Sequence, residues 1–246
     1  MSYLAYMGPD QLERAIAERW PVVVPAGCIE FHGSHLPFGT DLILVEEIVK
    51  RVEPHANIVV APAIAYGPTG YAVGGPKTGT IDIHAGVFKD YVKEILYSLY
   101  RMGFRRFVAI VHHQGPEGPE GVAFRMAAAE IFNELHRERG EGWYSDPVTH
   151  AVCGDWLMDV RVMGLTVGPS PWPGGHGGIS ETEPMLALRP DAVRMSLLRR
   201  DDYPWNWAPG NEADQADGAR GERWIEGIVQ DWIAFFEESG GKRDDE

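Results

Sequence analysis

Side chains that bind metal ions or move protons are concentrated between Gly27 and Asp41. The segment reads GCIEFHGSHLPFGTD and contains Glu30, His32 and His35 as well as Asp41. If the segment is extended, Glu30 and His32 project to the same side, because alternate residues of an extended chain share a face. Carboxylate and imidazole together suit zinc, manganese or iron, and a shared carboxylate bridges two ions roughly 3.5–4 Å apart. The cluster therefore predicts a metal centre.

Two residues of this segment have a second interpretation. Asp41, together with Thr40, is also well placed to cap the amino terminus of a following helix. His35 is either a further ligand or a residue that orients the loop through a hydrogen bond of its ring, and we favour the role outside the ligand shell. For the cluster of Glu30, His32 and Asp41 taken together, metal binding is the favoured interpretation.

A second motif, VHHQGPEG, follows an apolar run and contains the adjacent histidines His112 and His113. Neighbouring residues of a strand point to opposite faces, so only one of the two is expected to reach a common site. The other is then buried and hydrogen-bonded elsewhere. Spacing alone does not choose between them.

A third motif, GGHGGISETEPML, contains His176, Glu181 and Glu183. Glycines on both sides of the histidine allow the backbone to approach a ligand closely. The competing interpretation is a flexible surface loop with a solvated acidic patch. The motif taken alone fits both interpretations equally well.

Alternating strands and helices are predicted to position these motifs. Apolar strands are predicted within residues 21–27, 56–67, 105–116 and 145–156. Helices are predicted within residues 8–20, 40–53, 84–104, 120–140, 184–195 and 218–239. This alternation is typical of an α/β fold with a mostly parallel sheet, in which ligands bind at the carboxyl ends of the strands. The first two motifs follow predicted strands, so we expect them to meet at one edge of the sheet.

The bulk properties fit one globular domain. The chain has 246 residues, of which 44% are hydrophobic and 24% charged, so a single domain over residues 1–246 is expected, with 240–246 as a frayed tail. The net charge of -14 argues against nucleic acid and anionic membranes as partners. No segment resembles a signal peptide or a membrane span, which favours a cytoplasmic location.

The two cysteines, Cys28 and Cys153, are far apart and lack the CxxC spacing. A disulfide framework or a zinc site made of thiolates is therefore not expected. The favoured interpretation is that each cysteine is a small buried hydrophobic residue. Neither cysteine, nor Ser34, has a recognisable arrangement that would activate it as a nucleophile.

The motifs together resemble the creatininase family. GCIEFHGSHLPFGTDLILVEEIVKRV resembles the family's first motif, Gly-x-x-Glu-x-His-Gly-x-His-Leu-Pro-x-x-Thr-Asp. HGGISETEPMLALRPDAV resembles its later His-Gly/Ala-Gly-x-x-Glu-Thr segment, and KTGTIDI and GARGERWIEGIV resemble two further segments in the expected order. The resemblance implies a three-layer α/β/α sandwich, a metal-dependent amidohydrolase activity and assembly as a homohexamer.

The resemblance also implies roles for individual residues. The implied ligands of two divalent ions, zinc or manganese with iron as an alternative, are Glu30, His32, Asp41, His113 and Glu181. Asp41 matches the carboxylate that bridges the ions. His176 matches a histidine that transfers a proton in creatinine hydrolysis. Trp172 resembles a tryptophan that helps to cover the substrate, and Trp156 is a second candidate for that position.

The chain departs from the family pattern at Gly115, where the namesake enzyme places a metal-binding glutamate. Glu181 is the natural replacement and Glu117 is the alternative. This departure argues against creatinine as the substrate more than against metal-dependent hydrolysis. We therefore expect hydrolysis of a small amide, cyclic or formamide-like, by a metal-bound hydroxide. The alternatives are a non-catalytic protein that binds a metal or small ligand, and a metal-dependent isomerase or lyase acting on a sugar-like substrate.

Overall fold

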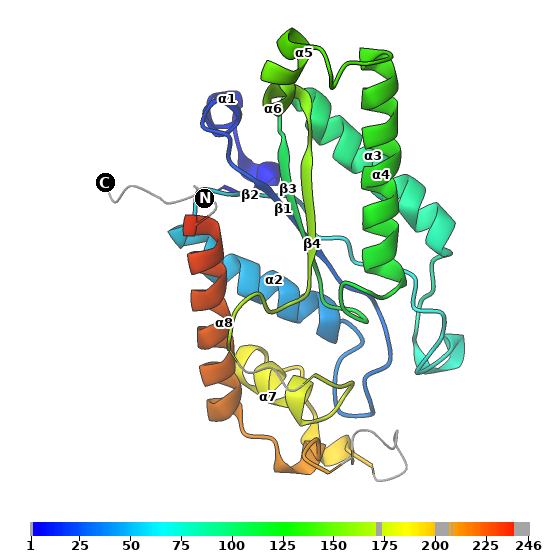
Figure 1. Cartoon of the computed structure of the whole chain (residues 1–246). Helices are drawn as coiled ribbons and strands as arrows, with labels where there is room; N and C mark the ends of the chain where they lie inside the picture. The colour runs from blue at the N-terminus through cyan, green and yellow to red at the C-terminus, as the bar shows by residue number, and fades with distance from the viewer. Residues whose placement is uncertain (1, 171–173, 200–206, 208, 239–246) are drawn as a thin grey trace.

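A parallel sheet covered by helices on both faces forms the centre of the molecule (Figure 1). The computed structural model describes residues 2–170, 174–199, 207 and 209–238. Its strands are β1 (Val22–Ala26), β2 (Val59–Val60), β3 (Arg106–Val111) and β4 (Asp159–Met163). They lie in the order β2-β1-β3-β4, and every pairing is parallel. The predicted parallel α/β sheet is therefore confirmed.

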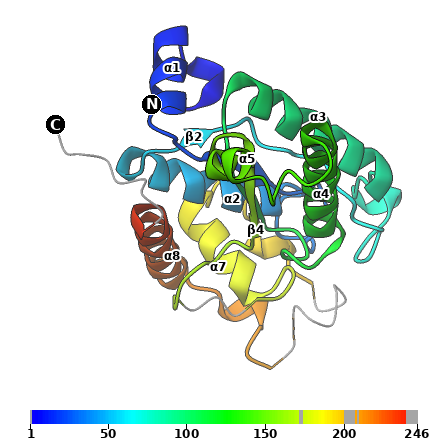
Figure 2. The same cartoon turned by 45° about the horizontal axis from the view of Figure 1, so that its top comes forward.

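Two layers of helices cover the sheet. The α-helices are α1 (Pro9–Ala17), α2 (Thr40–Val52), α3 (Ala85–Met102), α4 (Pro119–Arg139), α5 (Pro147–Ala151), α6 (Cys153–Trp156), α7 (Ile179–Leu188) and α8 (Gly218–Glu238). Short 3-10 turns are formed by Leu4–Tyr6, Glu53–His55, Pro76–Thr78, Met195–Leu197 and Ala213–Gln215. Helices α3 and α4 lie side by side over one face, and α2 and α8 cover the other, with α7 beside α8 (Figures 1 and 2).

Alternate residues of the central strands fill two separate cores. Val22 and Val24 of β1 pack in the core beneath α3 and α4, whereas Val23 packs in the core beneath α2 and α8. All five residues of β1 are buried, because a parallel sheet with helices on both faces leaves neither side to water. This double burial explains why the strand has a continuous apolar sequence.

The helix over residues 84–104 forms as its sequence predicts. The ring of His84 accepts a hydrogen bond from the backbone N–H of Gly86 at the amino terminus. Gly103 ends the helix with φ at 121°, a backbone conformation that residues with a side chain rarely adopt. Gly103 therefore provides the C-cap of this helix.

The prediction of a strand within residues 145–156 is wrong. This segment forms α5 and α6, and β4 begins only at Asp159. The side chain of Asp146 caps α5 by accepting a hydrogen bond from the N–H of Val148 at 3.0 Å, and Pro147 occupies the first helical position. These local signals outweigh the β-branched residues of the segment.

The limits of two other elements also differ from the prediction. The strand predicted within 56–67 contributes only Val59–Val60 and an isolated bridge between Ala26 and Ile64, since Pro62 interrupts the ladder. The helix predicted at 184–195 begins earlier, at Ile179, and ends at Leu188. The tail 240–246 lies outside the described residues. Within the described chain, no helix is both long and apolar enough to span a membrane.

Candidate metal centre

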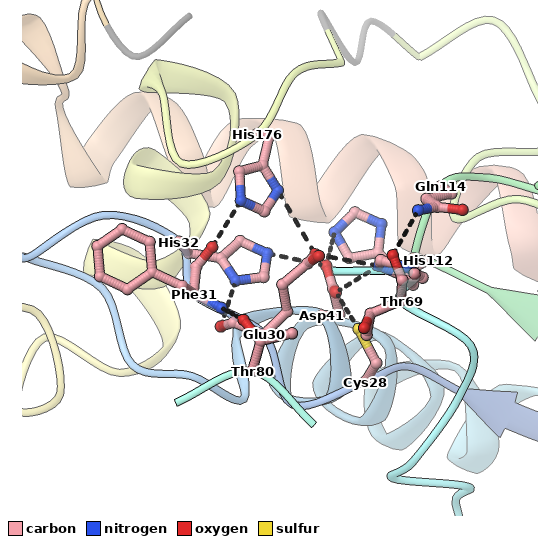
Figure 3. Close-up of polar contacts among 12 residues, drawn as sticks. Cys28, Glu30, Phe31, His32, Asp41, Thr69, Thr80, His112, Gln114 and His176 are labelled. Atoms are coloured by element: carbon pink, nitrogen blue, oxygen red, sulfur yellow. Dashed lines mark hydrogen bonds and ion pairs between the residues drawn. The ribbon is translucent and has the colours of Figure 1, made fainter. Parts of the chain in front are cut away.

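The three motifs meet at the carboxyl ends of β1 and β3 (Figure 3). Glu30 and His32 lie in the loop after β1, and His113 follows β3. Asp41 lies in the first turn of α2, and His176 lies in the glycine-rich loop before α7. The sequence argument predicted this meeting for the first two motifs, and the structure confirms it. The structure also brings in the third motif, for which the sequence had left two interpretations open.

Asp41 occupies the centre of this group and does not cap α2. The capping position is Gly39, and no side chain caps the helix. The Asp41 carboxylate is buried, with Oδ1 3.2 Å from Nε2 of His32 and Oδ2 3.3 Å from Nδ1 of His113. Gly27 permits this placement, because a Cβ there would lie 2.7 Å from the backbone nitrogen of Leu42. The helix-cap interpretation of Asp41 is therefore wrong.

One compact set of donor atoms, called site 1 below, consists of Cys28, Glu30, Asp41 and His113. Nδ1 of His113 lies 3.2 Å from Oε2 of Glu30, and the Cys28 thiol donates to Oδ2 of Asp41 at 3.1 Å. All four residues are buried, and their donor atoms lie within 4.8 Å of one another. The set has the residue types and the compactness of a site for one divalent ion.

A second set, called site 2 below, consists of His32, Asp41 and Glu181. Nε2 of His32 lies 3.2 Å from Oδ1 of Asp41 and 3.8 Å from Oε1 of Glu181. The other oxygen of Glu181 accepts a hydrogen bond from the N–H of Gly177 at 2.5 Å, which fixes the carboxylate. Asp41 thus turns one oxygen to each site.

Both adjacent histidines reach the centre, so the expectation that only one does so is wrong. Nε2 of His112 lies 3.5 Å from Oε1 of Glu181 and 3.9 Å from Oδ1 of Asp41. Strand β3 ends at Val111, and the chain then turns through Gln114 with φ at 53°. The alternation of a strand does not govern residues beyond its end. The end of the apolar run at Val111 is the signal that the sequence argument missed.

His176 lies over the ring of His32, with the two ring centroids 4.2 Å apart. Its Nε2 is 2.7 Å from the carbonyl oxygen of Phe31, so that nitrogen carries the proton and donates it (Figure 3). Nδ1 then faces the centre, 3.8 Å from Oε2 of Glu30. Burial, followed by the nearby His32, lowers the pKa of His176. The ring is therefore neutral at pH 7 and offers the lone pair of Nδ1.

The electrostatics of the buried donors favour positive charge. Burial opposes protonation of His32 and His113, but Asp41 with Glu181 or Glu30 outweighs it and raises the pKa of each histidine to about 10. Burial also opposes ionisation of Asp41, yet the histidines hold its pKa well below the ordinary range. Oε1 of Glu30 is buried and has no hydrogen-bond partner within the described structure. Divalent ions would satisfy both the negative potential and this oxygen, so the donor set fits metal ions.

Of the two candidate replacements for the glutamate absent at Gly115, only Glu181 lies in the centre. The Glu117 side chain is 84% exposed and pairs with Arg125 at 3.0 Å. Glu183 is buried but points to α8, where its Oε1 accepts a hydrogen bond from Nε of Arg220 at 2.6 Å. Glu183 therefore connects α7 to α8 and contributes to neither site.

His35 lies outside both sites. Its Nε2 is 2.9 Å from the hydroxyl oxygen of Thr182, the residue that follows Glu181. The backbone N–H of Arg194 also donates to the carbonyl oxygen of His35 at 2.8 Å. The first contact connects the loop after β1 to α7, and the second connects it to the segment after α7, so His35 stays a candidate for orienting the loop and Glu181.

The two tryptophans proposed to cover a substrate have different outcomes. Trp172 lies outside the described residues. Trp156 is buried in α6, with its ring 4.8 Å from that of Trp143. Helix α6 precedes β4, so it lies at the amino end of the parallel sheet, opposite the centre (Figure 1). The expectation that Trp156 contacts the substrate of this site is therefore wrong for this chain.

Glu120 is a buried acid that the sequence argument did not single out. It lies in the first turn of α4, and neither carboxyl oxygen has a hydrogen-bond partner among the residues described. Burial raises its pKa to about 8, while His113 opposes and Asp41 adds to the shift. At pH 7 the side chain is therefore mostly a neutral acid located near site 1.

A cavity of about 480 Å³ opens onto the centre. Small or apolar residues form much of its wall, among them Ala72, Val73, Gly115, Gly164, Leu165 and Gly175. Gln114, Thr166 and His176 add polar groups. Over the part of the wall that the structure describes, no lysine or arginine faces the cavity. The volume suits a small ligand, and the described lining provides no lysine or arginine to bind an anionic one.

Sequence comparison relates the chain to enzymes that hydrolyse several substrates. Residues 5–236 match the creatininase family, described as creatinine amidohydrolase. Creatinine amidohydrolase of Pseudomonas putida is 28% identical over 204 residues, which cover 81% of this chain and 75% of that protein. The 3-dehydro-scyllo-inosose hydrolase of Thermotoga maritima is 26% identical over 215 residues, which cover 87% and 64%. The mycofactocin precursor peptide peptidase of Mycolicibacterium smegmatis is 26% identical over 178 residues, which cover 70% and 59%.

Structural comparison gives the same fold. A creatininase variant with 22% identity matches with a TM-score of 0.75, over 97% of this chain and 98% of the other. A manganese form of creatininase has 23% identity and a TM-score of 0.74, and a zinc–zinc form of another variant has 24% and 0.73, each over the same shares of the two chains. These likenesses confirm the three-layer α/β/α sandwich, and with the donor sets they support a divalent metal cofactor. With the family match, they show that the chain belongs to the creatininase family of metal-dependent amidohydrolases.

Proposed function

We propose that the chain hydrolyses a small, uncharged amide with the aid of two divalent ions, one in site 1 and one in site 2. The main support for this proposal is that the two oxygens of Asp41 face different sites. Oδ1 lies 3.2 Å from Nε2 of His32 in site 2, and Oδ2 lies 3.3 Å from Nδ1 of His113 in site 1. A carboxylate shared in this way holds two ions roughly 3.5–4 Å apart, the spacing of two-metal hydrolases. Zinc and manganese are the favoured ions, with iron as an alternative.

The chain's own residues supply binding and proton transfer. Divalent ions bound here would polarise a substrate carbonyl and make water more acidic. His176 is placed to accept a proton at Nδ1, because its Nε2–H is held by the carbonyl oxygen of Phe31 at 2.7 Å. The same nitrogen can then return the proton to the departing amine. His176 is thus the proposed catalytic acid and base, and no side-chain nucleophile is required.

Charge defines the substrate class. Glu30, Asp41 and Glu181 provide three carboxylates, so two dications would leave the loaded centre with a net charge of about +1, which a bound hydroxide would neutralise. The described wall of the cavity carries no lysine or arginine, and His113 would be neutral as a metal ligand. A substrate carboxylate or phosphate would therefore have no partner there apart from the ions. A small neutral amide, cyclic or formamide-like, fits this environment. Gly115 in place of a glutamate argues against creatinine.

A second substrate class is kept because of one relative. The Thermotoga maritima protein is named a hydrolase of 3-dehydro-scyllo-inosose, which makes a sugar-like ring the second candidate. A non-catalytic binding protein is the remaining alternative. It would hold metal without turnover of either class.

Metal analysis followed by a substrate screen tests the proposal. The chain is prepared with zinc, manganese or iron, its metal content is counted, and lactams, cyclic ureas, hydantoins, formamides and inososes are assayed. We expect two ions per chain and turnover of an amide, both lost in Asp41→Asn. Turnover that persists without metal, or a chain that binds no divalent ion, would reject the proposal. Turnover of inososes alone would select the second class.

Assembly and location extend the proposal. The family resemblance implies a homohexamer, and the composition favours a cytoplasmic protein. The mass of the purified protein in light scattering tests the first, and fractionation of the source cells tests the second. A monomer at micromolar concentration would reject the hexamer.

A further inference from the structure

The position of Cys28 suggests more than a small buried side chain. Its thiol lies at the end of β1, 3.1 Å from Oδ2 of Asp41, in the same donor set as Glu30 and His113 (Figure 3). We propose that Cys28 is a ligand of site 1, so that this site binds its ion through one sulfur, one nitrogen and two carboxylate groups. The inference rests on the proposed function only in taking site 1 to hold a divalent ion.

The distances from His113 agree with one ion between its ring and the two carboxylates, and the Cys28 thiol lies within reach of the same ion. In a tetrahedral zinc site with bonds of about 2.0–2.1 Å to nitrogen and oxygen, neighbouring donor atoms lie about 3.3 Å apart. In site 1, Nδ1 of His113 lies 3.2 Å from Oε2 of Glu30 and 3.3 Å from Oδ2 of Asp41. The thiol lies 3.1 Å from the same oxygen of Asp41. The two distances from His113 match the edges of such a tetrahedron. An edge between sulfur and oxygen is longer, about 3.5 Å, because the zinc–sulfur bond is about 2.3 Å, so the thiol would move outward by a few tenths of an ångström on binding the ion.

Burial supports the thiol as the fourth donor. Cys28 is fully buried at the end of β1, so solvent does not reach the site from that side. Oε1 of Glu30 is also buried and lacks a hydrogen-bond partner in the described part of the chain. This unpartnered oxygen is a second sign, independent of the cysteine, that a cation belongs in the group.

A hydrogen bond from the thiol to Asp41 is the competing role. Without metal, Cys28 donates its proton to Oδ2 of Asp41, which positions that carboxylate. In the proposed state the thiol proton leaves to solvent and the sulfur binds the ion. The two roles differ in a measurable way, because only a ligand places sulfur at about 2.3 Å from zinc.

Sulfur in site 1 would make the two ions unequal. Thiolate favours zinc over manganese, whereas carboxylate and imidazole accept both. Four protein donors also close site 1, as in sites where the metal is structural, while the three donors of site 2 leave a position open. We infer that site 1 selects zinc and that the reacting carbonyl approaches the ion of site 2.

Two spectroscopic measurements on the full chain test the inference. Replacement of the native ions by cobalt should give a sulfur-to-cobalt charge-transfer band in the near ultraviolet, and X-ray absorption of the zinc form should show sulfur at about 2.3 Å. Both signals should vanish in Cys28→Ser and stay in Cys153→Ser, whose cysteine lies in α6 at the other end of the sheet. Zinc affinity of site 1 should fall by more than about 100-fold in Cys28→Ser, beyond the 10–100-fold effect of an outer partner.

The outcomes separate this inference from the proposed function. In one outcome, the wild-type chain binds cobalt, the binding requires Asp41, and no sulfur band appears. This outcome would overturn the ligand role of Cys28 and leave the two-ion centre intact. A chain that binds no cobalt at all would overturn both. The wild-type spectra decide the question even if Cys28→Ser fails to fold. A zinc-to-manganese preference unchanged in a folded Cys28→Ser would also contradict the inference.

Discussion

Sites 1 and 2 share Asp41, but different parts of the fold build them. The donors that belong to site 1 alone, Cys28, Glu30 and His113, follow β1 and β3, which pair in register so that Ala26 lies beside Val111 at their carboxyl ends. Site 2 adds Glu181, which reaches the centre from α7 after a loop whose Gly174, Gly175 and Gly177 all have positive φ. The first site therefore rests on the core of the sheet, and the second depends on a glycine loop. We expect site 1 to bind its ion more tightly and site 2 to exchange it.

The largest effect should come from the residue that the sites share. Asp41→Asn removes the charge that both ions need, so we expect both to be lost and turnover to fall by at least about 1,000-fold, since a catalytic ion contributes several kcal/mol. Metal content measured by mass spectrometry and the rate of amide hydrolysis check this. Asp191→Asn, which alters an exposed acid paired with Arg189, is the control. Full metal content in Asp41→Asn would contradict the shared position.

Replacement of Glu181 should separate the sites. Glu181→Gln removes a carboxylate from site 2 alone, so we expect about one ion per chain to remain, in site 1, with little turnover. Glu117→Gln is the matched control, because that glutamate lies on the surface beside Arg125. His113→Ala should give the reverse pattern, with site 1 weakened. Two ions retained in Glu181→Gln would show that its carboxylate is not a ligand.

His112 offers a finer test of site 2. Its Nε2 lies 3.5 Å from Glu181 and 3.9 Å from Asp41, so His112→Ala should lower the affinity of site 2 by about 10–100-fold, as for an outer partner of a metal ligand. Site 1 should keep its ion. Competition with a chelator measures the two affinities, and His55→Ala, in a surface turn, is the control. If His112→Ala lowered the metal affinity of both sites equally, His112 would act through the shared carboxylate of Asp41 and not through Glu181.

The sequence and the structure agree best where the chain order itself determines position. Glu30, His32 and His113 follow strands that a parallel sheet must bring to one edge, so their meeting was predictable. Asp41 was ambiguous in sequence, because a cap and a ligand occupy the same place in a first turn. The packing of α2 against Gly27 settles the ambiguity, and that contact is tertiary.

The errors of the sequence argument have a related cause. His112 was set aside by strand alternation, which stops at Val111. The interpretation of Cys28 as a small buried residue agrees with its full burial, but the sequence could not show its neighbours in space, which come from other segments. Trp156 was matched by residue type, although the element that carries it lies at the other end of the sheet. Position after a strand predicts a site better than residue type alone.

A pH effect should reveal the charge that the ions replace. The pKa of His32 and of His113 is raised to about 10 in the folded chain without metal. In the unfolded chain the histidine pKa is about 6.5. The raised pKa therefore stabilises the fold fully at a pH below 6.5, and this stabilisation is lost as the pH rises from 6.5 toward 10. Chemical denaturation of metal-free protein should therefore show a loss of several kcal/mol, at most about 7 kcal/mol for the two histidines together, between pH 7 and 9.5.

The metal-loaded protein is the control for this effect. Its histidines are already deprotonated by their ions, so its stability should lack this slope, and ion binding at pH 7 should release protons. Calorimetry in buffers of different ionisation enthalpy measures the release. Glu181→Gln, with one ion, should release fewer protons than the wild type. No proton release on filling either site would contradict the raised pKa values.

The smallest effect should come from Glu120, a buried acid whose charge interacts with His113 of site 1 and with the shared Asp41. Its pKa of about 8 means that the folded, metal-free chain keeps a proton there that the unfolded chain loses above about 4.5, so the buried acid reduces stability as the pH rises through this window. Glu120→Gln should therefore make metal-free protein more stable at pH 9, by about 1 kcal/mol.

An ion in site 1 would instead attract the charged carboxylate of Glu120. The same variant should therefore weaken metal binding at site 1 by several-fold and leave site 2 unchanged. Denaturation and zinc titration at pH 9 measure the two changes, with Glu117→Gln as the control. A weaker site 2 with an unaltered site 1 would show that Glu120 supports the loop-built site and not the one built on the sheet.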